Sequence, residues 1–188
     1  MPPSIHRPKQ PDVVRAAAIS AALDLLSDGG FDAVTLDAVA RRAGISKGGL
    51  QHHFRTKAAL LDGVGHFLAD EFMAQLNQAY LAEEDRPGRR ARAYIKVNFQ
   101  PVDPRWQKAI NVLAAHWPEG AERWQRVMQE ELAQDRLDAP EGYPLLLAAR
   151  LAADGYWLSQ MIDIYRMDEA LRASLLSSLL AMCDGVTK

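Results

Sequence analysis

Residues 35–54 read TLDAVARRAGISKGGLQHHF and predict two short helices joined by a tight turn. Gly44 stands where the chain turns, and glycine adopts the positive φ that a sharp connection between helices requires. Apolar Val39 and Leu50 lie on either side of the turn at helical spacing and can form a small core between the two helices. The stretch is therefore interpreted as a helix-turn-helix.

The second of these helices has the composition of a helix that reads DNA. Its glycines allow close approach of the backbone, and its amide, imidazole and ammonium groups can reach phosphates or base edges. The residues expected to point outward are Lys47, Gly48, Gly49, Gln51, His52 and His53. Such a turn also arises in helical proteins that do not bind DNA. A helical small-molecule-binding or scaffold protein, or a helical enzyme, therefore stays open as an alternative.

Prolines divide the rest of the 188-residue chain into helical segments, because proline suits helix starts and connections but breaks helix interiors. Apolar residues at helical spacing predict a first helix over Asp12–Leu26, and Ser46 and Thr56 are expected to cap the third and fourth helices. Five more helices are expected at 89–99, 104–117, 119–136, 144–165 and 167–184. No alternating β-branched runs occur, so the predicted fold is all-α, with nine helices in two domains.

Charge is unevenly distributed along the chain. Residues 1–60 carry eight basic and five acidic side chains, a balance of +3, whereas the whole chain has a net charge of −2. A basic first third is expected when only that part approaches nucleic acid. No apolar run is long enough for a membrane span or a signal peptide, and the single cysteine, Cys183, fits a reducing compartment. We therefore expect a soluble, cytoplasmic protein that makes no membrane contact.

The run from Ile45 to Leu61, preceded by Gly30-Phe31, Thr35-Leu36 and Ala43-Gly44, resembles the DNA-binding region of TetR (tetracycline-repressor-like) transcriptional regulators. The resemblance covers about residues 12–62, and the remainder resembles the family only in length and helical character. It implies a flexible N-terminal arm, a helix-turn-helix DNA-binding domain and a ligand-binding and dimerisation domain. The corresponding ranges are 1–11, 12–60 and 61–188.

The resemblance also implies roles for individual residues in binding double-stranded DNA. The expected DNA-binding residues are Thr35, Arg42, Lys47, Gly48, Gly49, Gln51, His52 and Lys57. Thr35 and Lys57 begin helices, whose free N–H groups can bind phosphate, and Gln51 can make a bidentate contact with adenine. Many family members carry Ser or Thr at position 49 and Tyr at 51 and 52, so the bases that are read cannot be transferred from the family.

A small-molecule effector is expected to bind in the helical body. All four tryptophans fall between residues 106 and 157, and aromatic faces beside an acidic group suit an organic cation. The expected ligand-binding residues are Phe67, Trp106, Trp117, Trp124, Met128, Asp154, Trp157 and Met161. No catalytic residue, metal site or cofactor is expected.

The last two predicted helices carry apolar residues on more than one face, which implies a second partner. In the family resembled, the corresponding helices form a homodimer, and two-fold symmetry matches an inverted-repeat operator. Leu175 and Leu179 are expected in that interface. The expected function is a ligand-responsive transcriptional regulator, most simply a repressor that a small apolar, aromatic or cationic molecule releases from DNA.

Overall fold

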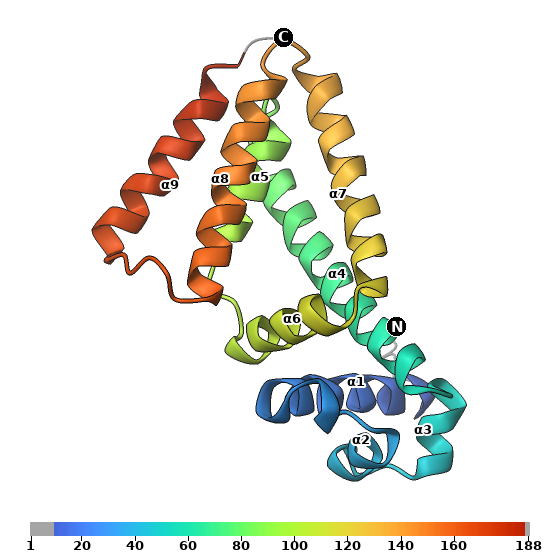
Figure 1. The fold of residues 1–188 in the computed structure, drawn as a ribbon. Helices are drawn as coiled ribbons and strands as arrows, with labels where there is room; N and C mark the ends of the chain where they lie inside the picture. Colours follow the sequence, from blue (N-terminus) through green and yellow to red (C-terminus); the bar gives the residue numbers. More distant parts are fainter. Residues whose placement is uncertain (1–9, 187–188) are drawn as a thin grey trace, which may run out of the picture. The chain divides into compact units, whose positions relative to one another are not determined.

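The computed structural model of the protein describes residues 10–186, and over this range it contains nine α-helices and no β-strand (Figure 1). The helices are α1 (Gln10–Gly29), α2 (Leu36–Ala43), α3 (Lys47–His53), α4 (Lys57–Ala82), α5 (Arg89–Asn98), α6 (Pro104–His116), α7 (Glu119–Asp138), α8 (Tyr143–Met161) and α9 (Glu169–Asp184). The prediction of an all-α fold is confirmed. The predicted arm lies outside the described residues up to residue 9, and residues 10 and 11 already belong to α1.

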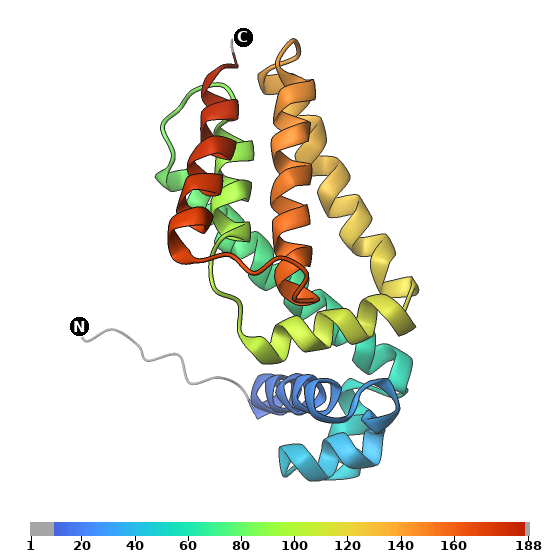
Figure 2. The same cartoon turned by 60° about the vertical axis from the view of Figure 1, so that its left-hand side comes forward.

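The helices form two compact units. The first contains the described part of Met1–Leu68 together with Asp103–Ala121, and the second contains Ala69–Val102 and the chain from Glu122 onward. The first unit includes α6 because this helix packs along α1 (Figures 1 and 2). Residues 61–68 and 103–121, which the sequence assigns to the ligand-binding and dimerisation domain, thus pack in the same unit as the helix-turn-helix.

Three side-chain caps fix the helix starts of the first unit. Thr35 Oγ1 accepts a hydrogen bond from Ala38 N at 3.1 Å, and Ser46 Oγ accepts one from Gly49 N at 3.0 Å. At the start of α4, Thr56 Oγ1 accepts a hydrogen bond from Ala59 N at 3.0 Å. Each cap satisfies a backbone donor that has no partner within its helix. The caps predicted at Ser46 and Thr56 are thus confirmed, and Thr35 caps α2 in the same way.

The helix-turn-helix is held against α1. Gly44 adopts the left-handed conformation, with φ 66°, and ends α2 as the sequence predicts. Val39 and Leu50 are fully buried and pack in one core with Ala18 and Ala22 of α1. The small alanine side chains let neighbouring helices approach closely, so α1 contacts α2 and α3 as well as α6.

Two glycines of α4, Gly63 and Gly65, have different surroundings. A Cβ added at Gly63 would lie 2.6 Å from a ring carbon of Phe54, whereas one added at Gly65 would meet no atom within 4 Å. We expect Gly63→Ala to lower the free energy of unfolding by about 1–3 kcal/mol through overpacking. Gly65→Ala should raise it by about 0.5–1 kcal/mol, because alanine loses less backbone entropy in a helix. Urea denaturation of the two variants measures both signs, and equal shifts would contradict the assignment of Gly63 as a packing glycine.

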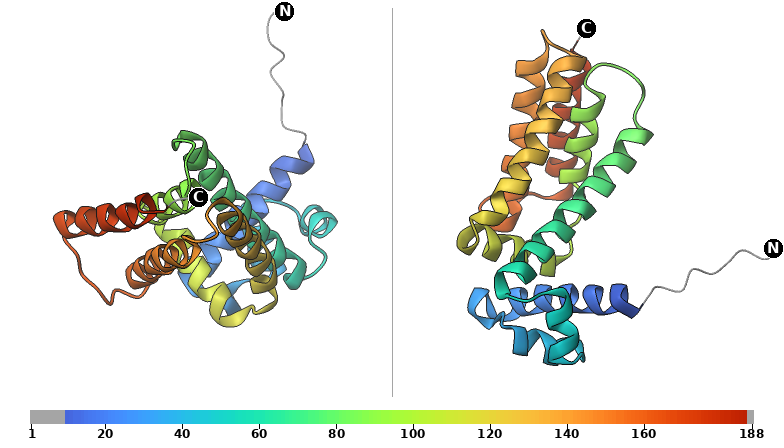
Figure 3. Two further views of the ribbon diagram at one scale, coloured as in Figure 1. Left: turned by 90° about the horizontal axis from the view of Figure 1, so that it is seen from above. Right: turned by 90° about the vertical axis from the view of Figure 1, so that its right-hand side faces the viewer.

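In the second unit, α5, α8 and α9 pack against one another (Figure 3). Ile95, Leu146 and Ala149 have no exposed surface in this core. Gly88, directly before α5, has φ 78°, and a Cβ there would lie 3.0 Å from the carbonyl oxygen of Cys183, so the position requires glycine. Burial raises the pKa of the Cys183 thiol to about 11, so this cysteine acts as a small packing residue.

The end of α8 differs from the sequence prediction. A helix through Tyr165 was expected, but α8 ends at Met161. Asp163 has φ 52°, a left-handed conformation that a short polar residue tolerates and that ends a helix. Helix α9 then starts at Glu169, where Asp168 Oδ1 accepts a hydrogen bond from the backbone N of residue 171 at 2.8 Å.

Candidate functional site

Helix α3 has a polar and largely exposed outer surface. Gln51 and His52 are exposed, and a Cβ added at Gly48 would meet nothing within 4 Å. Lys47 is also exposed, and its Nζ lies 2.8 Å from Asp37 Oδ1 of α2. Gly49 is half-buried, and its backbone N–H donates a hydrogen bond to the capping hydroxyl of Ser46. Of the predicted base-reading residues, Gly48 and Gln51 are therefore accessible and Gly49 is partly accessible, and the buried Leu50 anchors the helix in the core.

Lys57, predicted to contact phosphate, is held by Phe31. Its Nζ donates a hydrogen bond to Phe31 O at 2.7 Å and lies 3.9 Å from the centroid of the Phe31 ring. His116 and Trp117, at the end of α6, stack on the same ring with centroids 5.4 and 6.4 Å away. A lysine ammonium has three donor hydrogens, so the bond to Phe31 O leaves two for a phosphate. Phe31 therefore positions the Lys57 side chain, a role that the sequence alone does not reveal.

Arg42, another predicted DNA contact, already has carboxylate neighbours. Its Nη1 lies 3.2 Å from Asp28 Oδ2 and 4.0 Å from Asp24 Oδ2 of α1. Asp24 in turn accepts a hydrogen bond from Arg105 Nη1 of α6 at 2.9 Å. Exposed ion pairs of this kind contribute about 0–1 kcal/mol, so Arg42 can exchange its partners for a phosphate at small cost. Sequence reasoning missed Asp24 and Arg105, which lie 81 residues apart.

The eight predicted ligand-binding residues are divided between the two units. Phe67, Trp106 and Trp117 belong to the first, and the other five belong to the second. In the first unit, the rings of Phe67 and Trp106 meet edge to face with centroids 5.4 Å apart. The indole N–H of Trp117 donates to Asp62 Oδ1 at 3.1 Å. These contacts tie α4 and α6 together inside the unit that carries the helix-turn-helix.

In the second unit, the predicted ligand residues lie on α7 and α8, where Trp124 is 39% exposed and the other four are half-buried. Trp124 packs edge to face on Phe72 with centroids 4.9 Å apart, and Met128 packs against the cluster that contains Tyr94. The Tyr94 hydroxyl donates to Asp154 Oδ1 at 2.5 Å. Burial raises the pKa of both groups, and the Asp154 carboxylate raises that of Tyr94 further. The remaining two, Trp157 and Met161, are half-buried on α8.

A buried ion-pair network that sequence reasoning missed joins α5, α7 and α8. Arg150 and Asp135 are 3% and 1% exposed and contact each other directly. Glu131 lies 3.8 Å from Arg150 Nη2 and accepts a hydrogen bond from Arg90 Nη1 at 2.9 Å. The guanidinium of Arg150 also lies 4.4 Å from the centroid of the Tyr94 ring. Burial raises the pKa of Asp135, and the attraction of Arg150 opposes that rise.

Helix α8 exposes several large apolar side chains, and α9 exposes one. These are Leu145, Leu151 and Leu158 of α8 and Leu171 of α9, and Ile162, directly after α8, is exposed as well. Leu179, expected to face a partner, is instead buried in the core of its own protomer, and Leu175 is half-buried against that core. The interface expectation for Leu179 is therefore wrong, because a helix that packs on both α5 and α8 turns this leucine inward.

A capped helix-turn-helix with an exposed polar second helix, followed by a separate helical unit, is the architecture of a DNA-binding regulator. Residues 18–64 match the family described as bacterial regulatory proteins, tetR family, and residues 88–184 match the tetracyclin repressor-like C-terminal domain. The HTH-type transcriptional regulator BetI of Burkholderia mallei (strain NCTC 10229) is 31% identical over 160 residues, with 78% of this chain and 81% of BetI covered.

Solved structures show the same fold. A putative transcriptional regulator from Pseudomonas aeruginosa PAO1 superposes with a TM-score of 0.71 at 19% identity, covering 95% of this chain and 92% of that one. A putative TetR-family regulator from Rhodococcus sp. gives a TM-score of 0.68 at 16% identity, covering 92% and 98%. The chain belongs to the TetR family and is a DNA-binding transcriptional regulator. Among its described helices, none is long and apolar enough to cross a membrane.

Proposed function

We propose that the protein is a cytoplasmic repressor that binds an inverted-repeat operator as a homodimer and leaves it when a small molecule binds the second unit. The observation that carries the DNA-binding part is the accessible surface of α3, flanked by the capped N-termini of α2 and α4. Helix N-termini bind phosphates, and an exposed polar helix fits the major groove. No residue is assigned a catalytic role.

The eight DNA-binding residues are proposed to act in two groups. Thr35, Arg42, Lys47, His52 and Lys57 contact phosphates, which fix the position of the protein on DNA. Gly48, Gly49 and Gln51 face the base edges, which carry the sequence information.

The proposal is tested by binding of the protein to the DNA around its own gene, measured by fluorescence anisotropy in a salt titration. Lys57→Met should weaken binding to every sequence and reduce the slope of log K against log salt concentration by about 0.9, the value for one phosphate contact. Gln51→Ala should instead change the base preference at one position by about 1–3 kcal/mol and leave the salt slope unchanged.

Lys108, exposed on α6 in the same unit, provides the matched control for loss of one positive charge. Lys108→Met should keep the salt slope of the unsubstituted protein. If Lys57→Met and Lys108→Met give the same slope, Lys57 does not contact phosphate. Absence of any sequence-specific DNA binding would favour the alternative of a helical binding or scaffold protein.

For the effector, we propose that Trp124, Met128, Asp154, Trp157 and Met161 contribute to a site in the second unit. Their aromatic and thioether groups suit an apolar or aromatic molecule, and the Asp154 carboxylate suits a cationic one. Phe67, Trp106 and Trp117 lie in the first unit, so their predicted contact with the same ligand has less support from the packing.

An effector that quenches tryptophan fluorescence should also weaken operator binding, because a ligand shifts an equilibrium only through different affinities for its two states. By linkage, saturating operator DNA should weaken effector binding by the same factor. Parallel fluorescence and anisotropy titrations measure the two factors. Unequal factors, or an effector that binds without changing operator affinity, would contradict its role as the inducer.

A further inference from the structure

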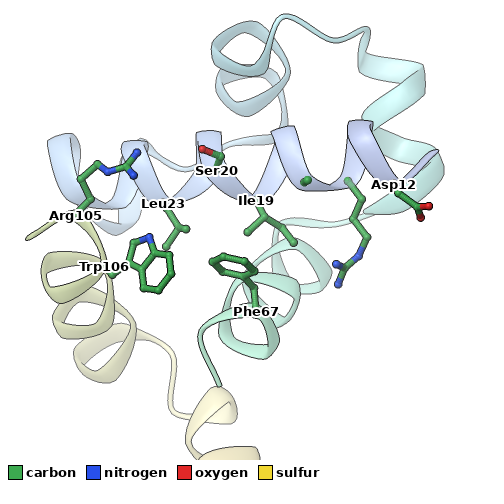
Figure 4. A pocket seen from close by; sticks show the side chains of 9 residues that line it. Asp12, Ile19, Ser20, Leu23, Phe67, Arg105 and Trp106 are labelled. Carbon is green, nitrogen blue, oxygen red and sulfur yellow. The ribbon is translucent and has the colours of Figure 1, made fainter. Parts of the chain in front are cut away.

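A cavity of 330 Å³ opens between α1 and α6 in the first unit (Figure 4). Its lining residues all belong to the first unit, whereas the five residues proposed for the effector site belong to the second. Its volume is at the lower end of the range for small-molecule sites, which suits a ligand with one or two rings.

The walls of the cavity are apolar and partly aromatic. Ile19 and Leu23 of α1 are each 3% exposed, and they face the rings of Phe67 and Trp106 (Figure 4). Because the Phe67 and Trp106 rings pack edge to face, each holds the orientation of the other. A flat ring can therefore lie against a preformed wall and lose little conformational entropy on binding.

The polar groups that line the cavity are mostly hydrogen-bond donors. Among the side chains that the structure describes (residues 12–118, 120 and 122–186), no carboxylate lies within 4.0 Å of the Arg15 guanidinium and no group accepts a hydrogen bond from Trp106 Nε1. Arg105, at the other end, already binds Asp24 and Asp103. Asp12 is the one carboxylate in the lining, and it is exposed in the first turn of α1, where the helix dipole favours its charge.

We propose that this cavity binds a small aromatic carboxylate, with its ring against Trp106 and Phe67 and its carboxylate on the guanidinium of Arg15. The Arg15 guanidinium lies 5.8 Å from the centroid of the Phe54 ring, a contact through the face of the guanidinium that leaves its N–H groups available. The pairing places an acceptor opposite these N–H groups, and an arginine binds a carboxylate through two parallel hydrogen bonds. A neutral ligand would leave these groups to water, and a cation would be repelled by them. The site does not depend on the proposed repressor function, since binding is measured on the protein alone.

The test uses full-length protein and two probes of equal shape, 2-naphthoate and the neutral 2-naphthamide. The chain has four tryptophans, so Trp106→Phe assigns one of four indole N–H signals in a ¹H–¹⁵N spectrum. Titration with 2-naphthoate should shift the Trp106 signal in a saturable way. Its dissociation constant should be lower than that of 2-naphthamide by about tenfold or more, the value of a hydrogen bond to a charged group.

Two exposed substitutions and one control complete the test. Arg15→Gln should abolish the preference for 2-naphthoate, and Ala16→Trp, at another lining residue, should weaken both probes by filling the cavity. Arg41→Gln, an exposed charge loss on α2, should change neither. The proposal is overturned if 2-naphthoate does not shift the Trp106 signal, if both probes bind equally, or if Arg41→Gln matches Arg15→Gln.

Discussion

Replacing Leu151 and Leu158 by aspartate is expected to yield a folded monomer whose operator affinity is lower by about 10²–10⁴-fold. The two leucines lie seven residues apart on α8 and are 60% and 48% exposed, so their own protomer does not bury them. Carboxylates on this face would be buried unpaired in an interface between two copies. Without the dimer, binding to one half-site no longer raises the effective concentration at the other. Sedimentation equilibrium and anisotropy measure the two effects.

The control is Leu137→Asp, at a leucine that is 75% exposed on α7 and outside the proposed interface. It should change neither the mass nor the operator affinity. A dimer that persists in the Leu151→Asp/Leu158→Asp variant would refute the interface. A monomer that keeps full operator affinity would refute the link between dimerisation and DNA binding.

Replacement of Arg150 by alanine should lower the free energy of unfolding by about 3–5 kcal/mol, because it leaves Asp135 buried without its partner. The loss should depend on pH. Removal of Arg150 raises further the pKa of a carboxyl that burial already holds above its ordinary value. The folded state then binds a proton that the unfolded state has released, so stability falls as pH rises. Urea denaturation should show a smaller loss at pH 5 than at pH 8.

Two further variants separate charge burial from simple loss of an arginine. Arg166→Ala removes a side chain that is 86% exposed and should change stability by less than about 0.5 kcal/mol. Arg150→Met/Asp135→Leu replaces the pair by apolar groups of similar size and should lose less stability than Arg150→Ala alone. A double variant as unstable as the single one would show that Asp135 carries no buried charge.

Sequence reasoning succeeded where a few neighbouring residues decide the structure. Thr35, Ser46 and Thr56 cap helices through atoms three residues away, and Gly44 needs only its own φ. The end of α8 was missed because no glycine or proline marks it. Asp163 ends the helix in a left-handed conformation, but an aspartate in the sequence does not by itself indicate that conformation.

The parts of the site that sequence could not predict depend on contacts between distant segments. The pair of Asp24 with Arg105 requires α6 to pack on α1 rather than on the other body helices. The inward orientation of Leu179 and the outward one of Leu158 follow from which face of each helix meets α5. A count of apolar residues shows that a helix has two apolar faces but does not show which face its own protomer covers.

The open surroundings of Gly48 affect how easily such a regulator changes its operator specificity. A side chain added there meets no neighbour, and Gln51 and His52 also point away from the core. Substitutions at these positions change the side chains that α3 presents to the major groove, whereas the buried core that orients α3 is unchanged. After gene duplication, a few substitutions at these positions could therefore give two copies different operators without loss of folding stability. The preferred operator sequence would then change faster than the fold.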